Sequence, residues 1–282
     1  MSLIESAMAR ARTNAADAKA PPKSVAARAA PSPALPPAAP TERITAPFVR
    51  PRMASCQEYR VMVDEVATKN DGAVAAYRIL RTRILQRARL RNWTTIGVTS
   101  ASVSDGKSLT ALNLSLSLAR ESNSEVILLD LDMRNPSVCR YLGVEPPRQL
   151  RDYFAGSVGA QDVFFTIGVE NLFLAAGDVR ATNASELLGN NRLDGLVQYI
   201  KQHTLSPIVL IDLPPLLNTD DALVVVPKID ATLLVVAEGH TDRAALNKAM
   251  ELLSDVPLAG LVLNQSIEST HGEAYGYGVA RD

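Results

Sequence analysis

Hydrophobic side chains recur at helical spacing between residues 73 and 90. Val74, Tyr77, Leu80 and Ile84 stand three or four positions apart, with Leu85 beside them. This spacing predicts an amphipathic helix over residues 73–90, and a shorter helical segment begins before it, near residue 55. The opposite face carries arginines with no acid among them: Arg78, Arg81, Arg83, Arg87 and Arg89.

From residue 94 onward, short aliphatic runs alternate with segments of helical spacing. The runs predict strands over residues 94–99, 126–130, 172–175, 208–212, 231–236 and 258–264. Helices are predicted over residues 108–120, 191–202 and 242–253. Such an alternation is typical of an α/β fold with a mostly parallel sheet that is covered by helices on both faces. Ligands bind such sheets beyond the carboxyl ends of the strands, so the candidate chemistry is expected there.

The composition of the chain changes sharply near residue 52. Nine of the 17 prolines lie in the first 51 residues, among many alanines. Such a segment buries too little apolar surface to offset the entropy of ordering it. We therefore predict a disordered Ala/Pro-rich region over residues 1–52 and a folded domain over residues 53–265, with N-terminal helices in 55–90. Beyond Asn264 the aliphatic pattern stops, which predicts a flexible tail over residues 266–282.

Charge and composition exclude several classes of protein. A formal net charge of −1 over 282 residues argues against a protein that coats nucleic acid. No apolar run approaches the roughly 18–20 residues that cross a bilayer, and the N-terminus lacks the apolar core of a secretory signal. The two cysteines and three histidines are scattered and show no metal-binding spacing. These features predict a cytoplasmic protein.

The segment between the first predicted strand and the next helix has the features of a phosphate-binding loop. Such a loop wraps backbone N–H groups around phosphates, and ends in a lysine for the β- and γ-phosphates and a hydroxyl for Mg²⁺. Gly106, Lys107 and Ser108 fill the last three positions, and Ala101 stands where the consensus has its first glycine. We predict that the loop binds ATP through Ser104, Asp105, Gly106, Lys107, Ser108 and Leu109.

Acidic residues end two of the other predicted strands. Asp130 and Asp132 alternate after one strand and can face one site, and Asp212 ends another. A carboxylate at the end of an apolar strand is costly to bury without a cation, and Mg²⁺ bound to a nucleotide supplies one. Each acid by itself could instead cap a helix. Arg134 either balances these carboxylates or contacts phosphate.

These motifs together resemble the bacterial tyrosine autokinases that control capsule and exopolysaccharide synthesis. The resemblance covers residues 72–282 and includes the phosphate loop, the DxDxRxP pattern that begins at Asp130 and the DxPP pattern that begins at Asp212. Residues 184–188 and 212–217 favour the subgroup associated with exosortase loci. The partitioning ATPases carry a signature lysine where this chain has Ser102, and the sequence lacks the NKxD motif of GTPases.

The resemblance implies roles for individual residues. Lys107 and Ser108 would hold the β/γ-phosphates and Mg²⁺, Asp212 would be the metal-associated Walker B acid, and Asn264 would lie near the base. One of Asp130 and Asp132 would accept the tyrosine proton or organise the metal. We accordingly predict catalytic roles for Lys107, Asp130, Asp132 and Asp212, and metal binding by Ser108, Asp132 and Asp212.

The family also implies phosphate acceptors and partners. The acceptors would be Tyr275 and Tyr277, which glycines flank in the tail. The self-association helix of the family carries a glutamate three residues ahead of an Arg-x-x-Arg; Arg78 and Arg81 match it, whereas Ala75 replaces the glutamate. Expected partners are other copies of the chain and a separate membrane-spanning activator, which would hold the protein at the inner face of the membrane.

Two other functions fit the same motifs. The chain could be a non-kinase ATPase whose nucleotide state controls assembly on a polysaccharide export complex. It could also be a nucleotide-binding scaffold without turnover, as Ala101, Ala75 and the small number of tail tyrosines would allow.

Overall fold

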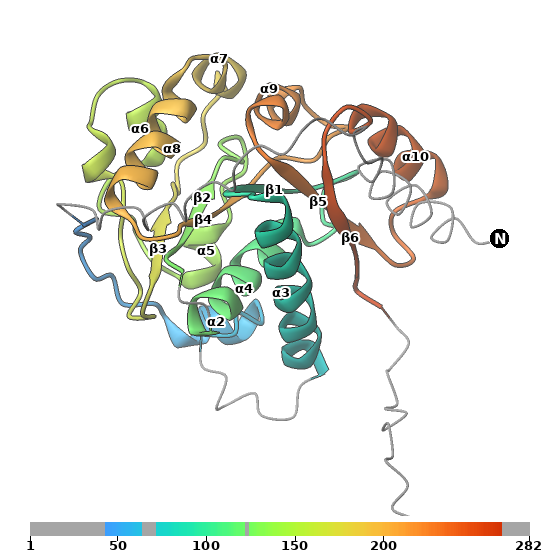
Figure 1. The fold of residues 1–282 in the computed structure, drawn as a ribbon, viewed down its shortest axis with the longest axis horizontal. Coiled ribbons are helices and arrows are strands. Elements are labelled where there is room, and N and C mark those ends of the chain that lie inside the picture. The colour runs from blue at the N-terminus through green and yellow to red at the C-terminus, as the bar shows by residue number, and fades with distance from the viewer. Residues whose placement is uncertain (1–42, 64–71, 122–123, 267–282) are drawn as a thin grey trace, which may run out of the picture.

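The computed structural model of the protein describes residues 43–63, 72–121 and 124–266, and these form an α/β fold (Figure 1). Six strands make one sheet in the order β3-β2-β4-β1-β5-β6, and each neighbouring pair is parallel. The strands are β1 (Thr95–Ser100), β2 (Val126–Asp130), β3 (Leu172–Ala175), β4 (Ile208–Asp212), β5 (Ala231–Ala237) and β6 (Leu258–Asn264). The predicted fold class is confirmed.

Helices pack on both faces of the sheet (Figure 1). One face is covered by α2 (Met53–Glu58), α3 (Gly72–Arg91), α4 (Lys107–Glu121) and α5 (Val138–Leu142). The other face is covered by α6 (Leu150–Phe154), α7 (Ala184–Gly189), α8 (Arg192–His203), α9 (Asp221–Val225) and α10 (Arg243–Leu252). Two 3₁₀ turns, η2 (Ala160–Asp162) and η3 (Val226–Lys228), complete the described elements. In the described segments, no helix combines the length and the apolar character needed to cross a bilayer.

The strands contribute alternate side chains to two hydrophobic cores, one on each face of the sheet. Along β2, Ile127 and Leu129 belong to the core under α6–α10, whereas Val126 and Leu128 belong to the core under α3 and α4. Successive side chains of a strand point to opposite faces, so a strand buried on both faces reads as a continuous aliphatic run. This is why the sequence predicted the six strands to within about two residues.

The short helices α5, α6, α7 and α9 were not predicted. Each has five or six residues, which is too short for a helical period to show in the sequence. The longer helices agree closely with the prediction. In α10, for example, the Asp242 side chain caps the helix by accepting a hydrogen bond from the amide of Ala245 at 2.7 Å.

The predicted boundary at residue 52 is wrong, because residues 43–52 are part of the folded domain. Ile44 is buried, and its amide donates to the carbonyl of His203 at 3.2 Å. The amide of Val49 donates to the carbonyl of Thr166 at 2.8 Å. Apolar residues between the prolines supply the contacts that the proline content had seemed to rule out. Residues 1–42 lie outside the described part of the chain.

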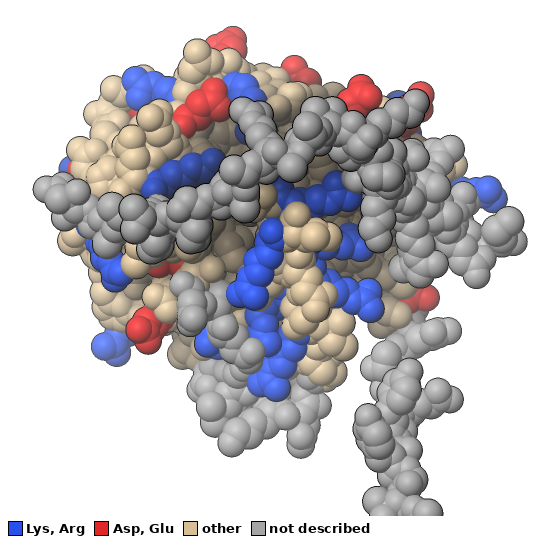
Figure 2. Space-filling model, in the orientation of Figure 1, with Lys and Arg blue, Asp and Glu red and all other residues tan. Residues whose placement is uncertain are grey.

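Helix α3 carries the expected basic face with one exception. Basic side chains gather over α3 in Figure 2, and Arg78, Arg83, Arg87, Arg89 and Arg91 are exposed there. Arg81, predicted on this face, is instead only 7 % exposed and donates to the carbonyl and hydroxyl oxygens of Ser117 on α4. Position 81 lies one turn from Ile84 and Tyr77 on the buried stripe, so its long side chain crosses to the neighbouring helix.

A side-chain clasp joins the start of β1 to the start of β5. The Asp230 carboxylate accepts hydrogen bonds from the amides of Thr94 and Thr95, at 2.7 and 2.8 Å, and from the Thr95 hydroxyl at 2.9 Å. The Thr95 hydroxyl in turn accepts from the Asp230 amide at 2.9 Å. Burial by itself would raise the pKa of Asp230, but these donors outweigh it and lower the pKa.

We predict that Asp230→Ala lowers the free energy of unfolding by about 1–3 kcal/mol at pH 7, because half-buried donors lose their acceptor. A group with a lowered folded-state pKa stabilises fully above its ordinary pKa of about 3.9. That contribution is lost as the pH falls through the folded-state value. The difference in the free energy of unfolding between the Asp230→Ala variant and the parent, measured by urea unfolding, should therefore be smaller at pH 3 than at pH 7. Asp255→Ala, at an exposed position, is the matched control. An equal loss of free energy of unfolding in this control would contradict the stabilising role of the Asp230 hydrogen bonds.

Candidate active site

The acidic strand ends meet at one edge of the sheet. Strand β4 lies between β1 and β2, and the register pairs Asp212 with Asp130 on one side and with Val98 on the other. Both aspartates have the side-chain direction of the core under α3 and α4, because they continue the alternation of Leu128 and Leu210. The parallel sheet therefore places two carboxylates side by side, next to the loop that follows β1.

Lys107 is the cation around which this edge is built. It is the first residue of α4, and its side chain is 10 % exposed. Its ammonium group lies 2.7 Å from Asp132 Oδ2 and 3.5 Å from Asp212 Oδ1, and donates to the Ser108 hydroxyl at 3.0 Å. The structure thus brings together four of the predicted site residues from three separate β–α junctions.

The site contains more negative than positive charge. Three carboxylates, at Asp130, Asp132 and Asp212, surround the single ammonium of Lys107, and all four residues are buried. Burial and then the neighbouring Asp212 raise the pKa of Asp130 to about 8. Burial also raises the pKa of Asp212, to about 6, against the lowering effect of Lys107. Burial would lower the pKa of Lys107, but Asp212 and Asp132 outweigh it and raise the value. Burial is the largest cause of both raised pKa values, and a neighbouring carboxylate raises each one further.

Asp130 is oriented by backbone amides rather than by Lys107. Its Oδ2 accepts from the amides of Ser137 and Val138, at 3.0 and 3.1 Å, where α5 begins. Its Oδ1 accepts from the amide of Asp132 at 3.2 Å. The carboxylate therefore fixes the turn that carries Asp132 into the site, which leaves Asp132 as the member of the pair that contacts the lysine.

The donor set fits Mg²⁺ bound together with a nucleotide. The buried Oδ2 of Asp212 has no hydrogen-bond partner among the described residues, so this oxygen is available to a cation or its water. Mg²⁺ in nucleotide sites is held through one or two carboxylates and phosphate oxygens, and a hydroxyl like that of Ser108 completes the set. A divalent ion would also offset the excess negative charge.

The phosphate loop has the backbone conformation that its sequence predicts. Gly106 has φ +90°, and a Cβ at this position would lie 2.0 Å from the Asn264 side-chain nitrogen. That amide nitrogen donates to the carbonyl of Asp105 at 2.9 Å, and the Gln265 side chain donates to the carbonyl of Ser104 at 2.9 Å. In this structure Asn264, expected near the base, supports the loop from the end of β6. Leu109 is half-buried and lines the cleft that opens over this loop.

Asp105 points away from the nucleotide side of the loop and is fully buried. Its carboxylate accepts from the Ser102 amide at 3.0 Å and from the Thr241 hydroxyl at 2.9 Å, and it pairs with His240 Nδ1 at 2.9 Å. Sequence reasoning missed His240 and Thr241. The signal was their position directly after β5, at the same edge of the sheet as the other site residues.

Arg134 forms its ion pair with a residue that the sequence did not single out. Its guanidinium binds both oxygens of Asp221, at 2.6 and 3.1 Å, and donates to the carbonyl of Thr182 and the hydroxyl of Ser185. Arg134 thus balances a carboxylate at the start of α9 instead of Asp130 or Asp212. It still lines the active-site cleft.

A cleft of about 1540 Å³ opens over these residues and is large enough for a nucleotide. Lys107, Ser108 and Asp132 line it, and it continues between α3 and β6. Ala101, the departure from the loop consensus, is fully buried. The predicted acceptors Tyr275 and Tyr277 lie outside the described residues.

Known proteins are similar to this chain in sequence and in fold. Residues 93–274 match the family described as ParA, NUBPL iron-transfer P-loop NTPase. Tyrosine-protein kinase YwqD of Bacillus subtilis is 28% identical over 208 residues, 73% of this chain and 86% of that protein. Tyrosine-protein kinase CpsD of Streptococcus pneumoniae serotype 4 is 28% identical over 176 residues, 60% of this chain and 75% of that protein.

A solved structure agrees with these relatives. The kinase domain of the Escherichia coli tyrosine kinase ETK superposes with a TM-score of 0.67 at 26% identity, over 78% of this chain and 85% of that one. The match to an exosortase-associated subgroup stays a prediction. The fold, the phosphate loop and these similarities show that the chain belongs to the ParA family of P-loop NTPases, in which the relatives that it resembles are bacterial tyrosine-protein kinases.

Proposed function

We propose that this protein is an ATP-dependent tyrosine autokinase that phosphorylates Tyr275 and Tyr277 in the tail of another copy and thereby regulates exopolysaccharide synthesis or export. The observation that carries the proposal is the convergence of Lys107, Ser108, Asp132 and Asp212 at the ends of neighbouring strands. The similarity to CpsD and YwqD supports a tyrosine as the acceptor. A separate membrane-spanning activator would place the protein at the inner face of the membrane.

Each site residue has a definable task in this reaction. In the transfer, the bond between the γ-phosphorus and the bridging oxygen of ADP breaks, and a bond to the phenolic oxygen of tyrosine forms. The loop amides and Lys107 neutralise the phosphate oxygens, so Lys107 exchanges Asp132 for phosphate when ATP enters. Mg²⁺ held by Ser108 and Asp212 would add further charge neutralisation and would leave Asp132 uncoordinated. The phenolic proton passes to a carboxylate at the cleft.

Asp132 is better placed than Asp130 to accept that proton. Asp132 lines the cleft and contacts only one strong donor side chain, Lys107, which leaves it when phosphate binds. Asp130 is held by three backbone amides and does not line the cleft. We therefore assign Asp132 as the general base and Asp130 as the residue that positions it.

The first prediction concerns Lys107. Lys107→Met removes the charge that balances the β/γ-phosphates, so purified protein incubated with labelled ATP and Mg²⁺ should lose all detectable phosphotyrosine on a blot. The exposed Lys248→Met on α10 is the matched control and should keep its label. Persistent label in Lys107→Met protein that melts like the parent would mean that the site is wrongly assigned.

The second prediction separates the two aspartates. Asp132→Asn should lower the rate of tyrosine labelling on the order of 10²–10⁴-fold, the usual contribution of a general base. Its ATP affinity, measured by titration with a fluorescent nucleotide, should change much less. Asp130→Asn should chiefly lower the melting temperature, because an amide oxygen replaces a carboxylate at three backbone donors. Equal losses of rate for both variants, with equal melting temperatures, would remove the distinction.

The same incubation tests the two other functions. Phosphate release without labelled protein would favour the ATPase that acts as a nucleotide-controlled switch. Nucleotide binding with neither label nor phosphate release, in the presence of the membrane partner, would favour the scaffold.

A further inference from the structure

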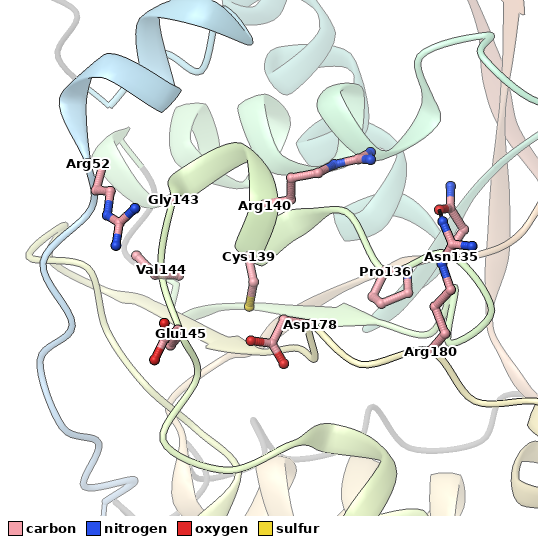
Figure 3. Close-up of a pocket in the computed structure, with 10 residues that line it drawn as sticks. All are labelled: Arg52, Asn135, Pro136, Cys139, Arg140, Gly143, Val144, Glu145, Asp178 and Arg180. Atoms are coloured by element: carbon pink, nitrogen blue, oxygen red, sulfur yellow. Dashed lines mark hydrogen bonds between the residues drawn. The ribbon is translucent and has the colours of Figure 1, made fainter.

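A second cavity, of about 390 Å³, opens beside the active site (Figure 3). It lies among the loops that follow β2 and β3, and α5 forms one wall. Asn135 and Arg140 line both this cavity and the active-site cleft, so the two adjoin at these residues. Arg180, on the loop after β3, lies beside Asn135 in Figure 3.

Two arginines at this junction carry charges that no carboxylate of the described residues neutralises. Arg180 donates to the side-chain oxygen of Asn135 at 3.3 Å. Arg140 donates to the Ser137 hydroxyl at 3.1 Å and lies over the Tyr141 ring at 5.3 Å. Among the described residues, neither guanidinium forms an ion pair with a carboxylate, and both side chains are exposed. Exposed guanidinium groups without a carboxylate partner beside a cleft are suited to bind an anion.

The acids of the cavity do not occupy this junction. Glu145 lies toward the opposite end of the cavity in Figure 3, and Asp178 lies between the two ends. Asp178 already accepts a hydrogen bond from Gln149 at 2.5 Å. Arg52 lies near Glu145 at the far end, whereas the charged side chains at the end beside the active-site cleft are Arg140 and Arg180.

A short chain of contacts connects Arg180 to the reaction centre. Arg180 binds the Asn135 side chain, and the Asn135 amide donates to Asp132 Oδ1 at 3.1 Å. Asp132 in turn contacts Lys107 at 2.7 Å. Asn135 is thus the single residue that connects Arg180, where the anion would bind, to Asp132, the proposed base. In an extended peptide, alternate side chains point the same way and are about 7 Å apart. A peptide can therefore place a tyrosine in the active site and the residue two positions away at this junction.

The tail has a matching pattern of anions. Glu273 stands two positions before Tyr275, and Tyr275 stands two positions before Tyr277. Before any modification, Glu273 is the only acid within four residues of either tyrosine. After modification, phosphotyrosine 275 carries a charge of about −1.5 to −2. Each tyrosine can thus have an anion two positions before it, but Tyr277 acquires its anion only after Tyr275 has reacted.

We propose that Arg140 and Arg180 form an anion subsite for the residue two positions before the reacting tyrosine of a second copy, so that Tyr275 is phosphorylated before Tyr277. This rests on the proposed function. In each event the γ-phosphoryl group of ATP moves to one phenolic oxygen, and ADP and one proton are released. Glu273 occupies the subsite in the first event, and the phosphate on Tyr275 occupies it in the second. The order of modification is thus set by where the arginines lie.

The main test separates the enzyme copy from the acceptor copy. The enzyme carries Tyr275→Phe and Tyr277→Phe, so its own tail cannot be labelled, and the acceptors are full-length Lys107→Met chains with altered tails. Glu273→Gln should raise the KM for labelling of Tyr275 on the order of tenfold with little change in kcat, because one charged hydrogen-bonding partner is lost. Tyr275→Phe should slow labelling of Tyr277 by a similar factor, and Tyr275→Glu should restore it. Equal labelling of Tyr277 in acceptors with tyrosine, phenylalanine or glutamate at position 275 would overturn the proposal.

Enzyme variants test the arginines themselves. Arg140→Ala and Arg180→Ala should remove the difference between the parent and Glu273→Gln acceptors, and Arg180→Glu should partly recover activity toward Glu273→Arg acceptors. The exposed Arg243→Ala on α10 is the matched control and should keep the parent preference. A preference for Glu273 that survives in both arginine variants would contradict the subsite.

A binding measurement distinguishes failure of the subsite from failure of the kinase. A labelled peptide of residues 271–282 with phosphotyrosine at position 275 should bind the full chain, by fluorescence anisotropy, on the order of tenfold more tightly than it binds Arg180→Ala. Arginine-dependent binding without any tyrosine labelling would contradict the proposed function but would support the anion subsite. Labelling of the two tyrosines in either order, with peptide binding that ignores both arginines, would end the subsite alone.

Discussion

One buried ammonium group shares the edge of the sheet with three buried carboxylates, and most of the site follows from this imbalance. Lys107 can neutralise only part of the charge of Asp130, Asp132 and Asp212, so burial and mutual repulsion raise the pKa of Asp130 and of Asp212. Folding keeps these groups together because strands β1, β4 and β2 are adjacent and in register. A bound divalent cation would offset the carboxylates and would leave Lys107 free to pair with phosphate.

The phosphate loop is supported from the side of the sheet that carries no catalytic acid. His240 and Thr241 after β5 hold the Asp105 carboxylate, while Asn264 and Gln265 at the end of β6 hold the carbonyls of Asp105 and Ser104. The loop is therefore clamped between two sets of strand ends: acids from β2 and β4 on one side, and hydrogen-bond donors from β5 and β6 on the other. Movement of either set would change the position of the backbone amides that face the nucleotide.

A net charge near zero conceals a strong separation of charge. Acids gather inside the active site, whereas arginines line α3 and the junction of the two cavities. Arg81 shows that the basic stripe of α3 also has an internal use, because its guanidinium binds Ser117 and joins α3 to α4. Arg140 and Arg180 differ from Arg81 because their side chains are exposed at the surface, beside the active-site cleft.

The sequence by itself determined the strands, the long helices, the phosphate loop and the identity of Lys107, Ser108, Asp132 and Asp212. These could be predicted because burial on both faces makes a parallel strand continuously aliphatic, and because polar residues at strand ends stand out against such runs. The tertiary structure decided what depends on contacts between distant segments. It showed that Arg134 pairs with Asp221, that residues 43–52 pack on the domain and that His240 supports Asp105. A hydrogen bond between residues more than 80 positions apart leaves no periodic trace in a sequence, so only the folded chain reveals which polar groups meet.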